Sequence, residues 1–361
     1  MEKITRRALL QWSVTMGLAT MAASCVPTTS PVSDMDAEQP TSTKTMGSSA
    51  PVDKDRPTAT PAATQPKPGV EEATATKLAQ SSATREPSPT PPEAAYLAAV
   101  HGSDPEAITQ RAVAAIGGME RFVQPGDDVI VKPNICNANH SFEYASTTNP
   151  QVVATLVTLA LEAGAKRVHV MDNPFSGTAQ RAYERSGIAE AVKAAGGTME
   201  LMSQHKYVET DIPEGKDLES WLFYQPILEA DVVIDVPIAK HHNLAHLTLA
   251  GKNLMGTIEN RPAMHRNLGQ RIADITSRVR PQLTVMDAVR MLMDHGPTGG
   301  DLDDVKRADT VIASHDLVAV DAYTTTLFEM EPEDIGYITA STEMDLGEMD
   351  LGHLDIQEIE I

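Results

Sequence analysis

The sequence predicts an α/β fold, in which a mostly parallel sheet is flanked by helices, either as one sheet or as two Rossmann-like halves. Two observations lead to this prediction. From residue 96 onward, short runs of β-branched and other apolar residues alternate with amphipathic segments. The runs are apolar almost throughout, as expected for parallel strands that are covered on both faces.

Five strands and four helical segments are expected. In chain order they are strand 128–132, helix 150–163, strand 167–171, helical segments over 179–195, strand 231–236, helix 270–279, strand 283–286, strand 310–313 and helix 317–328. In the third helical segment Ile272, Ile275 and Val279 are spaced to lie on one face.

The first 25 residues have the pattern of an export signal. Lys3, Arg6 and Arg7 are followed by an apolar stretch that is too short for a transmembrane helix. The arginine pair resembles the twin-arginine pattern, and the stretch ends at Cys25 in a sequence that resembles a lipobox. We expect a lipoprotein that is anchored through Cys25 on the extracytoplasmic face. The alternatives are cleavage without lipidation, which gives a secreted or periplasmic protein, and a retained anchor.

Residues 26–95 are expected to be a disordered tether. They contain 12 of the 24 prolines and 20 Ser/Thr residues, but no Phe, Tyr or Trp. Such a segment buries too little apolar surface to offset the entropy lost on ordering. The folded part therefore comprises residues 96–361, which are enough for one large core or two small ones.

Charge and cysteine content exclude several functions. The chain has a net charge of −21, of which residues 96–361 carry −20. This balance argues against nucleic-acid binding and against docking of the folded part on anionic lipid, so that contact with a membrane is expected only through Cys25. The two cysteines, Cys25 and Cys136, are too few for a self-contained iron–sulfur cluster. The acidic segment 329–361 is interpreted as a solvated surface.

Polar residues follow each predicted strand. They are Lys132-Pro133-Asn134, Asp172-Asn173-Pro174, Lys240-His241-His242, Asp287 and Ser314-His315-Asp316. Ligands of parallel α/β sheets bind at the carboxyl ends of the strands, where such residues converge. Asp316 is also a typical helix N-cap, and this simpler role would fit Asp172 as well. A capping role does not explain Lys132 or Lys240.

Residues 240–266 hold the densest set of chemically active side chains. Six of the 11 histidines lie between His241 and His315, and Lys252 lies in a glycine-bounded turn. Imidazoles are suited to divalent metals or to proton transfer near neutral pH, and a lysine in such a turn is suited to an anion. His242 and His246 would share one face if this segment were helical. Each histidine, taken alone, also fits a surface or core position.

The candidate site residues fall into three sets. For proton transfer they are His242, His246, His265 and Asp287; for ligand binding they are Lys132, Asn134, Lys240, Lys252, Asn253 and Arg261; for a metal they are His241, His242, His246 and Asp172.

Several motifs recur in one order along the chain. They are Val131-Lys132-Pro133-Asn134, Thr147-Thr148-Asn149-Pro150, Lys240-His241-His242, Gly251-Lys252-Asn253-Leu254-Met255-Gly256 with His265, Val285-Met286-Asp287, Gly296-Pro297 with Gly299-Gly300, and Ala319-Val320-Asp321-Ala322. Together they resemble the DUF362 family of bacterial and archaeal proteins, over residues 96–347. The activity of that family is not established. Some members carry a ferredoxin-like iron–sulfur domain, for which this chain lacks the cysteines.

A second similarity covers only a short stretch. Gly251-Lys252, the glycine-containing turn and His265 resemble the lysine–glycine–histidine segment of nickel-dependent lactate racemase-like proteins. In those proteins the lysine holds a pincer cofactor and histidines act as acid and base.

The sequence therefore leaves three functions open. The first is an extracytoplasmic protein with an enzyme-like site that binds a small anion or a divalent metal at the strand ends. The second is a non-catalytic, tethered lipoprotein that captures a metal or an anion. The third is a metal-cofactor-dependent enzyme of the racemase or oxidoreductase kind. Substrate, reaction and oligomeric state are not predicted.

Overall fold

The computed structural model describes residues 94–361. The expected export signal with Cys25, and nearly all of the expected tether, lie outside the described residues. Among residues 94–361, no helix has both the length and the apolar character needed to cross a bilayer.

Ten strands form one sheet, and β5 and β6 form a separate hairpin. The strands are β1 Leu97–His101, β2 Asp128–Pro133, β3 Arg167–Val170, β4 Thr198–Met199, β5 Tyr207–Asp211, β6 Ser220–Tyr224, β7 Val232–Val236, β8 Ile238–His242, β9 His246–Thr248, β10 Leu283–Leu292, β11 Val305–Ser314 and β12 Ile356–Glu360.

The helices are mostly short. They are α1 Pro105–Ala115, α2 Pro150–Glu162, α3 Ala179–Arg185, α4 Ile188–Ala194, α5 Gln225–Glu229, α6 Ala250–Asn253, α7 Arg261–Met264, α8 Leu268–Val279, α9 Leu317–Thr326 and α10 Gly336–Thr342.

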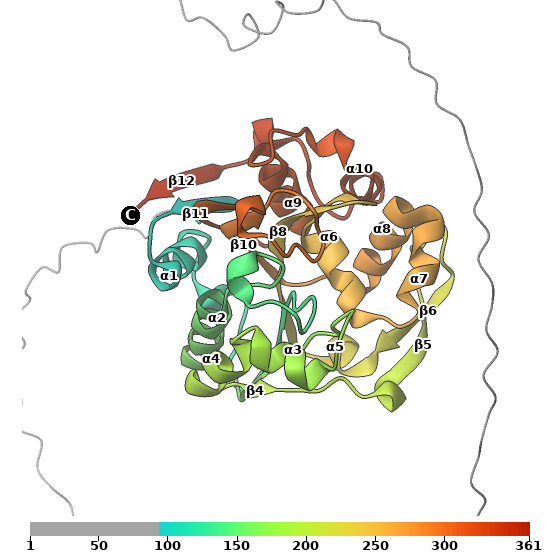
Figure 1. The fold of residues 1–361 in the computed structure, drawn as a ribbon, viewed down its shortest axis with the longest axis horizontal. Coiled ribbons are helices and arrows are strands. Elements are labelled where there is room, and N and C mark those ends of the chain that lie inside the picture. The colour runs from blue at the N-terminus through green and yellow to red at the C-terminus, as the bar shows by residue number, and fades with distance from the viewer. Residues whose placement is uncertain (1–93) are drawn as a thin grey trace, which may run out of the picture. The chain divides into compact units, whose positions relative to one another are not determined.

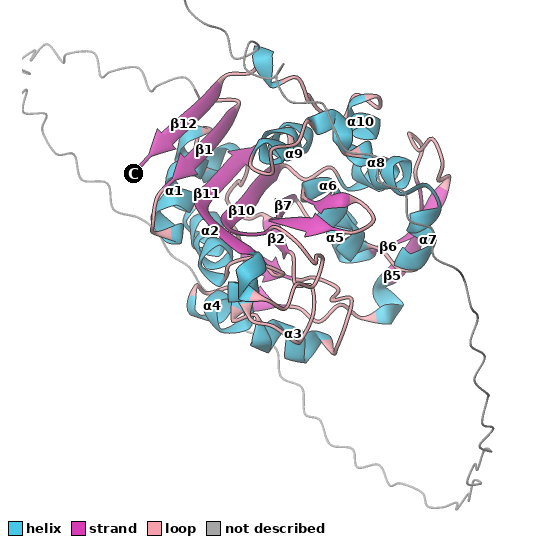
Figure 2. Cartoon of the chain, turned by 45° about the horizontal axis from the view of Figure 1, so that its top comes forward, coloured by secondary structure: helices cyan, strands magenta, loops and turns pink. Residues whose placement is uncertain are grey.

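The main sheet is mixed but mostly parallel. Its order is β12-β1-β11-β10-β7-β2-β3-β4, and β8 and β9 branch off beside β10 (Figure 2). The pairs from β10 through β7, β2 and β3 to β4 are parallel. Strand β11 is antiparallel to both β10 and β1. The predicted fold class is confirmed, with one continuous sheet rather than two separate halves.

Helices cover both faces of the sheet (Figure 1). Alternate residues of one strand enter different cores, because successive side chains of a strand point to opposite faces. In β2, for example, Val129 and Val131 pack in the core under α1, α2 and α4. Ile130 packs in the other core, with residues of α8, α9 and α10. The near-continuous apolar runs of the sequence follow from this double coverage.

All nine predicted elements are present, and two strands are longer than expected. Strands β10 and β11 extend beyond the apolar runs 283–286 and 310–313 as a long antiparallel pair. Their outer parts contain charged residues and therefore do not form apolar runs. The prediction that Asp316 caps a helix is also confirmed, because its carboxylate accepts from Val318 N at 2.8 Å and Ala319 N at 3.0 Å.

The acidic segment 329–361 is more than a solvated surface, which corrects the prediction. Helix α10 packs against α8, and its Tyr337 and Ile338 are buried. Strand β12 pairs in parallel with β1 at the edge of the sheet (Figure 2). In β12 the acidic residues Glu358 and Glu360 alternate with apolar ones, and α10 is a short helix within an otherwise acidic segment.

Candidate functional site

The site begins where two neighbouring parallel strands place polar side chains on the same face. Lys132 of β2 lies directly opposite Asp235 of β7 in the register of the sheet. Two residues earlier in each strand, Ile130 and Val233 pack in the core that contains residues of α8, α9 and α10. Lys132 and Asp235 therefore point toward the layer that contains α6.

The Lys132 ammonium is buried and fully hydrogen-bonded. Its Nζ donates to Asp172 Oδ1 at 2.9 Å, to Asn253 Oδ1 at 3.0 Å and to the carbonyl oxygen of Pro133 at 3.0 Å. Asp172 uses its second oxygen to accept from Ile135 N at 2.6 Å. Because the three donors of Lys132 are occupied, this lysine anchors the carboxyl ends of β2 and β3 to α6.

A chain of amide groups links Lys132 to Lys240. Asn253 Oδ1 also accepts from Asn134 Nδ2 at 2.9 Å, and Asn134 Oδ1 accepts from Lys240 Nζ at 3.0 Å. Asn253 Nδ2 donates to Asp235 Oδ1 at 2.8 Å. Four residues predicted to bind a ligand, from three separate segments, thus form one connected network.

Lys240 is buried without a carboxylate partner. Its side chain is 1% exposed, and Nζ donates to Asn134 Oδ1 and to the carbonyl oxygen of Ser146 at 2.7 Å. Among residues 94–361 it forms no ion pair, unlike Lys132. Burial lowers the pKa of Lys240, although the neighbouring Cys136 acts in the opposite direction.

Lys252, which is partly buried, also has no counterion among the described residues. It lies on α6, and the contact of its ammonium within hydrogen-bonding range is to Met255 Sδ at 3.6 Å. Burial lowers its pKa to about 8, and the nearby charges of Lys240 and Arg261 lower it further. Cys136 opposes that shift.

The turn that carries Lys252 is held by a buried carboxylate. Asp321 of α9 accepts from Ala250 N at 2.6 Å and from Gly251 N at 2.9 Å, at the N-terminal end of α6. Burial raises the pKa of Asp321, whereas these two backbone donors lower it. Asp321 thus fixes the position of Lys252 without contacting its ammonium.

Gly256 lies in the 3-10 turn that follows α6, between residues Leu254 and Thr257. A Cβ at this position would collide with Asp172 Oδ1 and would lie 2.8 Å from Lys132 Nζ. Only a glycine lets this turn pack against the Lys132–Asp172 ion pair.

Arg261 borders the same cluster. Its guanidinium donates to the carbonyl oxygens of Asn173 at 2.8 Å and Pro174 at 3.3 Å, in the loop after β3. It is close enough to Lys252 to lower the pKa of that lysine. The cluster of Lys240, Lys252 and Arg261 is therefore a concentration of positive charge in a domain whose net charge is strongly negative.

His242 and His265 carry their protons on different ring nitrogens. His242 Nδ1 accepts from Leu244 N at 3.1 Å and from Ala245 N at 3.3 Å. His265 Nδ1 lies 3.1 Å from the carbonyl oxygen of Pro262, which can only accept. The neutral form of His242 therefore holds its proton on Nε2, and that of His265 holds its proton on Nδ1.

His241 and His246 lie at the edge of this region. His241 Nδ1 accepts from Gly296 N at 3.1 Å. His246 is exposed and lies opposite His242 across the β8–β9 hairpin. The segment is thus a hairpin and not a helix. The four-residue spacing of His242 and His246 therefore does not place them on one helix face.

The four metal candidates do not form a common ligand set in the structure. Both oxygens of Asp172 are occupied, and Nδ1 of His241 and of His242 accepts from the backbone. Within residues 94–361, no three side chains of His, Cys, Asp or Glu are arranged to hold a metal ion.

Asp287 lies outside the cluster. Its carboxylate accepts from Asn149 N at 2.6 Å and Val289 N at 3.0 Å, which ties the start of α2 to β10. Burial raises the pKa of Asp287 to about 6, against the effect of those two donors. These contacts give Asp287 a structural role.

Asp235 and Asp321 were not predicted to belong to the site. Both lie within otherwise apolar runs, in β7 and α9, and both are buried. An acidic residue inside an apolar element is itself a signal, because a buried carboxylate requires a partner. Cys136 is also buried beside the cluster, and its thiol lies 3.5 Å from the carbonyl oxygen of Pro297.

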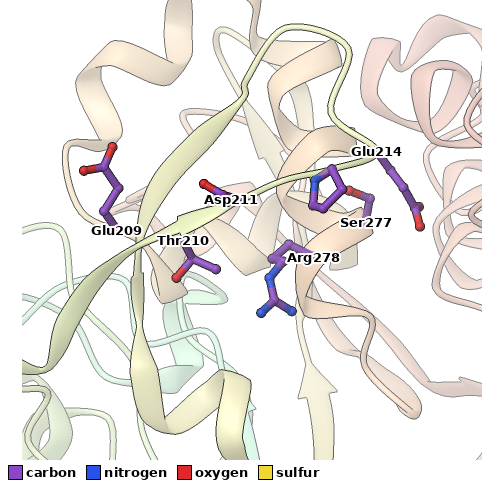
Figure 3. A pocket seen from close by; sticks show the side chains of 7 residues that line it. Glu209, Thr210, Asp211, Glu214, Ser277 and Arg278 are labelled. Carbon is purple, nitrogen blue, oxygen red and sulfur yellow. The ribbon is translucent and has the colours of Figure 1, made fainter.

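A surface pocket of about 560 Å³ lies elsewhere, between the end of β5 and α8 (Figure 3). It is lined by Glu209, Thr210, Asp211, Pro213, Glu214, Ser277 and Arg278. None of these residues belongs to the lysine cluster. Three of the seven are acidic, so this pocket does not match the electrostatics of an anion site.

The chain is similar to a curated protein and to several solved structures, two of which are described here. A thylakoid-associated protein of Synechocystis sp. is 28% identical over 240 residues, which are 64% of this chain and 72% of that protein. The lactate racemase apoprotein of Thermoanaerobacterium thermosaccharolyticum aligns with a TM-score of 0.39 and 11% identity, over 61% of this chain and 54% of that one. A protein of Thermotoga maritima aligns with a TM-score of 0.35 and 12% identity, over 67% and 60%. The chain thus spans less than two thirds of either solved structure.

A family model identifies most of the folded part. It matches residues 129–326, which include Lys132, Lys240, Lys252 and Asp321. The chain belongs to the DUF362 family, a domain of unknown function.

Proposed function

We propose that the chain binds a small anion, a carboxylate or a phosphate, at the carboxyl ends of β2, β7 and β8. Lys240 and Lys252 are the residues expected to contact it, with Arg261 at the border. The observation that carries this proposal is that neither lysine forms an ion pair among residues 94–361, whereas Lys132 does. Lys240 is buried and Lys252 is partly buried. A cation that is withdrawn from water without a counterion is costly, and an anionic ligand reduces that cost.

The acidic residues nearest to the lysines have other partners. Asp172 binds Lys132 and Ile135 N, Asp235 accepts from Asn253, and Asp321 holds the start of α6. They are therefore poor candidates for neutralising Lys240 and Lys252. The surrounding domain is acidic, so a cationic cluster within it also favours small anions over polyanions, which the outer surface repels.

Binding of acetate and of inorganic phosphate, measured by calorimetry, tests the proposal. Lys252→Met is expected to weaken binding about tenfold or more, which is the usual effect of losing a hydrogen bond to a charged group. Lys166→Met is the matched control, because Lys166 is exposed and lies outside the cluster. Equal affinities in the wild type and Lys252→Met, or no binding of either anion to the wild type, would contradict the proposal.

The proposed anion site is compatible with an enzyme and with a capture protein. A substitution of His265 distinguishes these two functions. Its Nε2 is the ring nitrogen left free to accept a proton, because Nδ1 faces Pro262. In an enzyme, His265→Gln would abolish turnover and leave anion binding within about threefold. A capture protein has no turnover to lose. Anaerobic purification of the exported protein, followed by mass spectrometry of bound molecules, would identify the anion to use.

A divalent metal and a metal-containing cofactor are weaker candidates. Nδ1 of His241 and of His242 is occupied by a backbone N–H. Among residues 94–361, no three side chains of His, Cys, Asp or Glu are grouped to ligate a metal ion. Elemental analysis of the anaerobically purified protein tests this alternative independently of anion binding.

We further propose that the domain is exported and anchored through Cys25. The arginine pair and the lipobox-like sequence support this, and the relative from Synechocystis sp. is described as thylakoid-associated. Cys25→Ala is expected to move the protein from the membrane fraction to the soluble fraction. A mature N-terminus at Cys25 that carries no lipid mass would contradict the anchor.

A further inference from the structure

We infer that His242 is a fixed hydrogen-bond donor, which presents its Nε2–H group to the bound anion. It is then neither a metal ligand nor a proton acceptor. The inference rests on the anion site proposed above and adds the chemistry of one more contact. An atom of the ligand that faces His242 must be a hydrogen-bond acceptor.

The backbone of the β8–β9 turn fixes the position of the proton. Leu244 N and Ala245 N both point at His242 Nδ1, at 3.1 and 3.3 Å. A backbone N–H can only donate, so Nδ1 must offer its lone pair. A neutral imidazole carries one proton, which must then be on Nε2.

The charges around His242 keep the ring neutral. Burial is the largest effect that lowers its pKa, to about 3, and the charges of Lys252 and Lys240 follow. The smaller contributions, from His265 and His241, also come from groups that can become cationic. None of these largest effects comes from a carboxylate. An imidazolium is therefore disfavoured here throughout the physiological pH range.

The Nε2–H group has no protein partner within residues 94–361. The hydrogen bonds of His242 use Nδ1. Nε2 is not one of the fully buried polar atoms without a partner. Nε2 therefore remains accessible to solvent although the residue as a whole is only 8% exposed. A donor that is open to solvent and close to Lys252 is suited to an oxygen atom of an anion.

This arrangement defines the class of ligand more closely. The charged groups that act most strongly on His242 are the ammonium groups of Lys252 and Lys240. These two groups and the N–H of His242 all donate. A carboxylate or phosphate supplies acceptors for all three. The ammonium group of a zwitterion would face the same cations, so acetate is expected to bind more tightly than glycine.

Nitrogen-15 NMR of the histidine rings tests the tautomer without any ligand. His242 is expected to show a protonated Nε2 and an unprotonated Nδ1, unchanged between pH 8 and pH 5. His265 is the internal control, because its Nδ1 faces the Pro262 carbonyl and it is expected to show the opposite tautomer. A proton on Nδ1 of His242, or titration of His242 near the ordinary histidine pKa of about 6.5, would overturn the inference.

Two substitutions of His242 test the contact with the anion. The Oδ1 atom in His242→Asn can still accept from Leu244 N and Ala245 N, but the side chain has no donor at the Nε2 position. His242→Gln extends a side-chain N–H to about that position. We expect His242→Asn to weaken acetate binding about tenfold, and His242→Gln to bind within about threefold of the wild type.

The outcomes distinguish this inference from the proposed function. Equal acetate affinities in the wild type and His242→Asn would overturn the role of His242 and leave the lysine site intact. A wild type that binds neither acetate nor phosphate would overturn both. Melting temperatures of the two variants show whether the hairpin is retained, and glycine binding as tight as acetate binding would contradict the donor-only lining.

Discussion

Lys132 and Asp235 lie directly opposite each other on β2 and β7, yet they do not form an ion pair. Asn253 lies between them, with Oδ1 accepting from Lys132 and Nδ2 donating to Asp235. Lys132 instead pairs with Asp172. A single amide thus separates two opposite charges in the sheet and connects both to the segment that carries Lys252.

Removal of Lys132 is expected to destabilise the fold strongly. Lys132→Met would leave Asp172 buried without its cation, at a cost of about 3–5 kcal/mol. Asp172→Asn should cost less free energy of unfolding in the Lys132→Met background than in the wild type, because the carboxylate is already unpaired in that background. Urea unfolding of the two single variants and the double variant measures the coupling. Additive free energies would show that the ion pair contributes nothing beyond its separate parts.

Gly256 is expected to tolerate no side chain. Gly256→Ala would push a methyl group into the Lys132–Asp172 pair, which must then separate. We expect a loss of about 3 kcal/mol or more in the free energy of unfolding, together with weaker anion binding. Gly336→Ala is the control, because the nearest atom to a Cβ there is 4.0 Å away. Similar stabilities for the two variants would show that the packing around Gly256 can adjust.

Asp235 is expected to make stability depend on pH. Burial raises its pKa from 3.8 to about 7, although Lys132 and Asn253 act in the opposite direction. The folded state holds the proton of Asp235 more tightly than the unfolded state does. The resulting contribution to the free energy of unfolding is complete below about pH 4 and is lost as the pH rises to about 7. Asp235→Asn remains neutral, so its stability relative to the wild type should increase over that range, by up to about 4 kcal/mol. A pH-independent difference between the two proteins would contradict the raised pKa.

Asp321 is expected to matter for binding although it does not contact the lysine ammonium groups. Asp321→Asn would replace one acceptor of the Ala250 and Gly251 amides by a donor, at a cost of about 1–3 kcal/mol. The turn that presents Lys252 would loosen, and acetate binding should weaken. Asp345→Asn is the control, because Asp345 is exposed in a left-handed conformation that Asn also adopts. Unchanged binding in Asp321→Asn would show that α6 does not depend on this anchor.

The sequence predicts the sheet well because its inner strands are buried on both faces. Strands 128–132, 167–171 and 231–236 stand out as apolar runs. Lys132, Asn134 and Lys240 lie at the ends of these runs or beyond them, and hydrogen bonds through Asn253 connect them. The hairpin β8–β9 was not predicted. Its polar residues Lys240, His241 and His242 hide a strand, and the spacing of His242 and His246 also fits a helix.

The partners of each charge could not be predicted from the sequence. Lys132, Lys240 and Lys252 have the same residue type and similar surroundings in the chain, but one has a carboxylate partner and two have none among the described residues. That difference depends on which loops meet in space. The tautomers of His242 and His265 depend in the same way on backbone groups a few residues away, which only the folded turns bring into place.

The most direct test of the anion site is the pH dependence of acetate affinity in the wild type and Lys252→Arg. The pKa of Lys252 is about 8, and acetate keeps its charge above pH 6. If only the ammonium form binds, the apparent affinity of the wild type should fall about tenfold from pH 7 to pH 9. Lys252→Arg keeps its positive charge, so its affinity should stay constant over that range. A wild-type affinity that does not change with pH, or an equal fall in Lys252→Arg, would contradict the assignment of Lys252 as the cation that holds the anion.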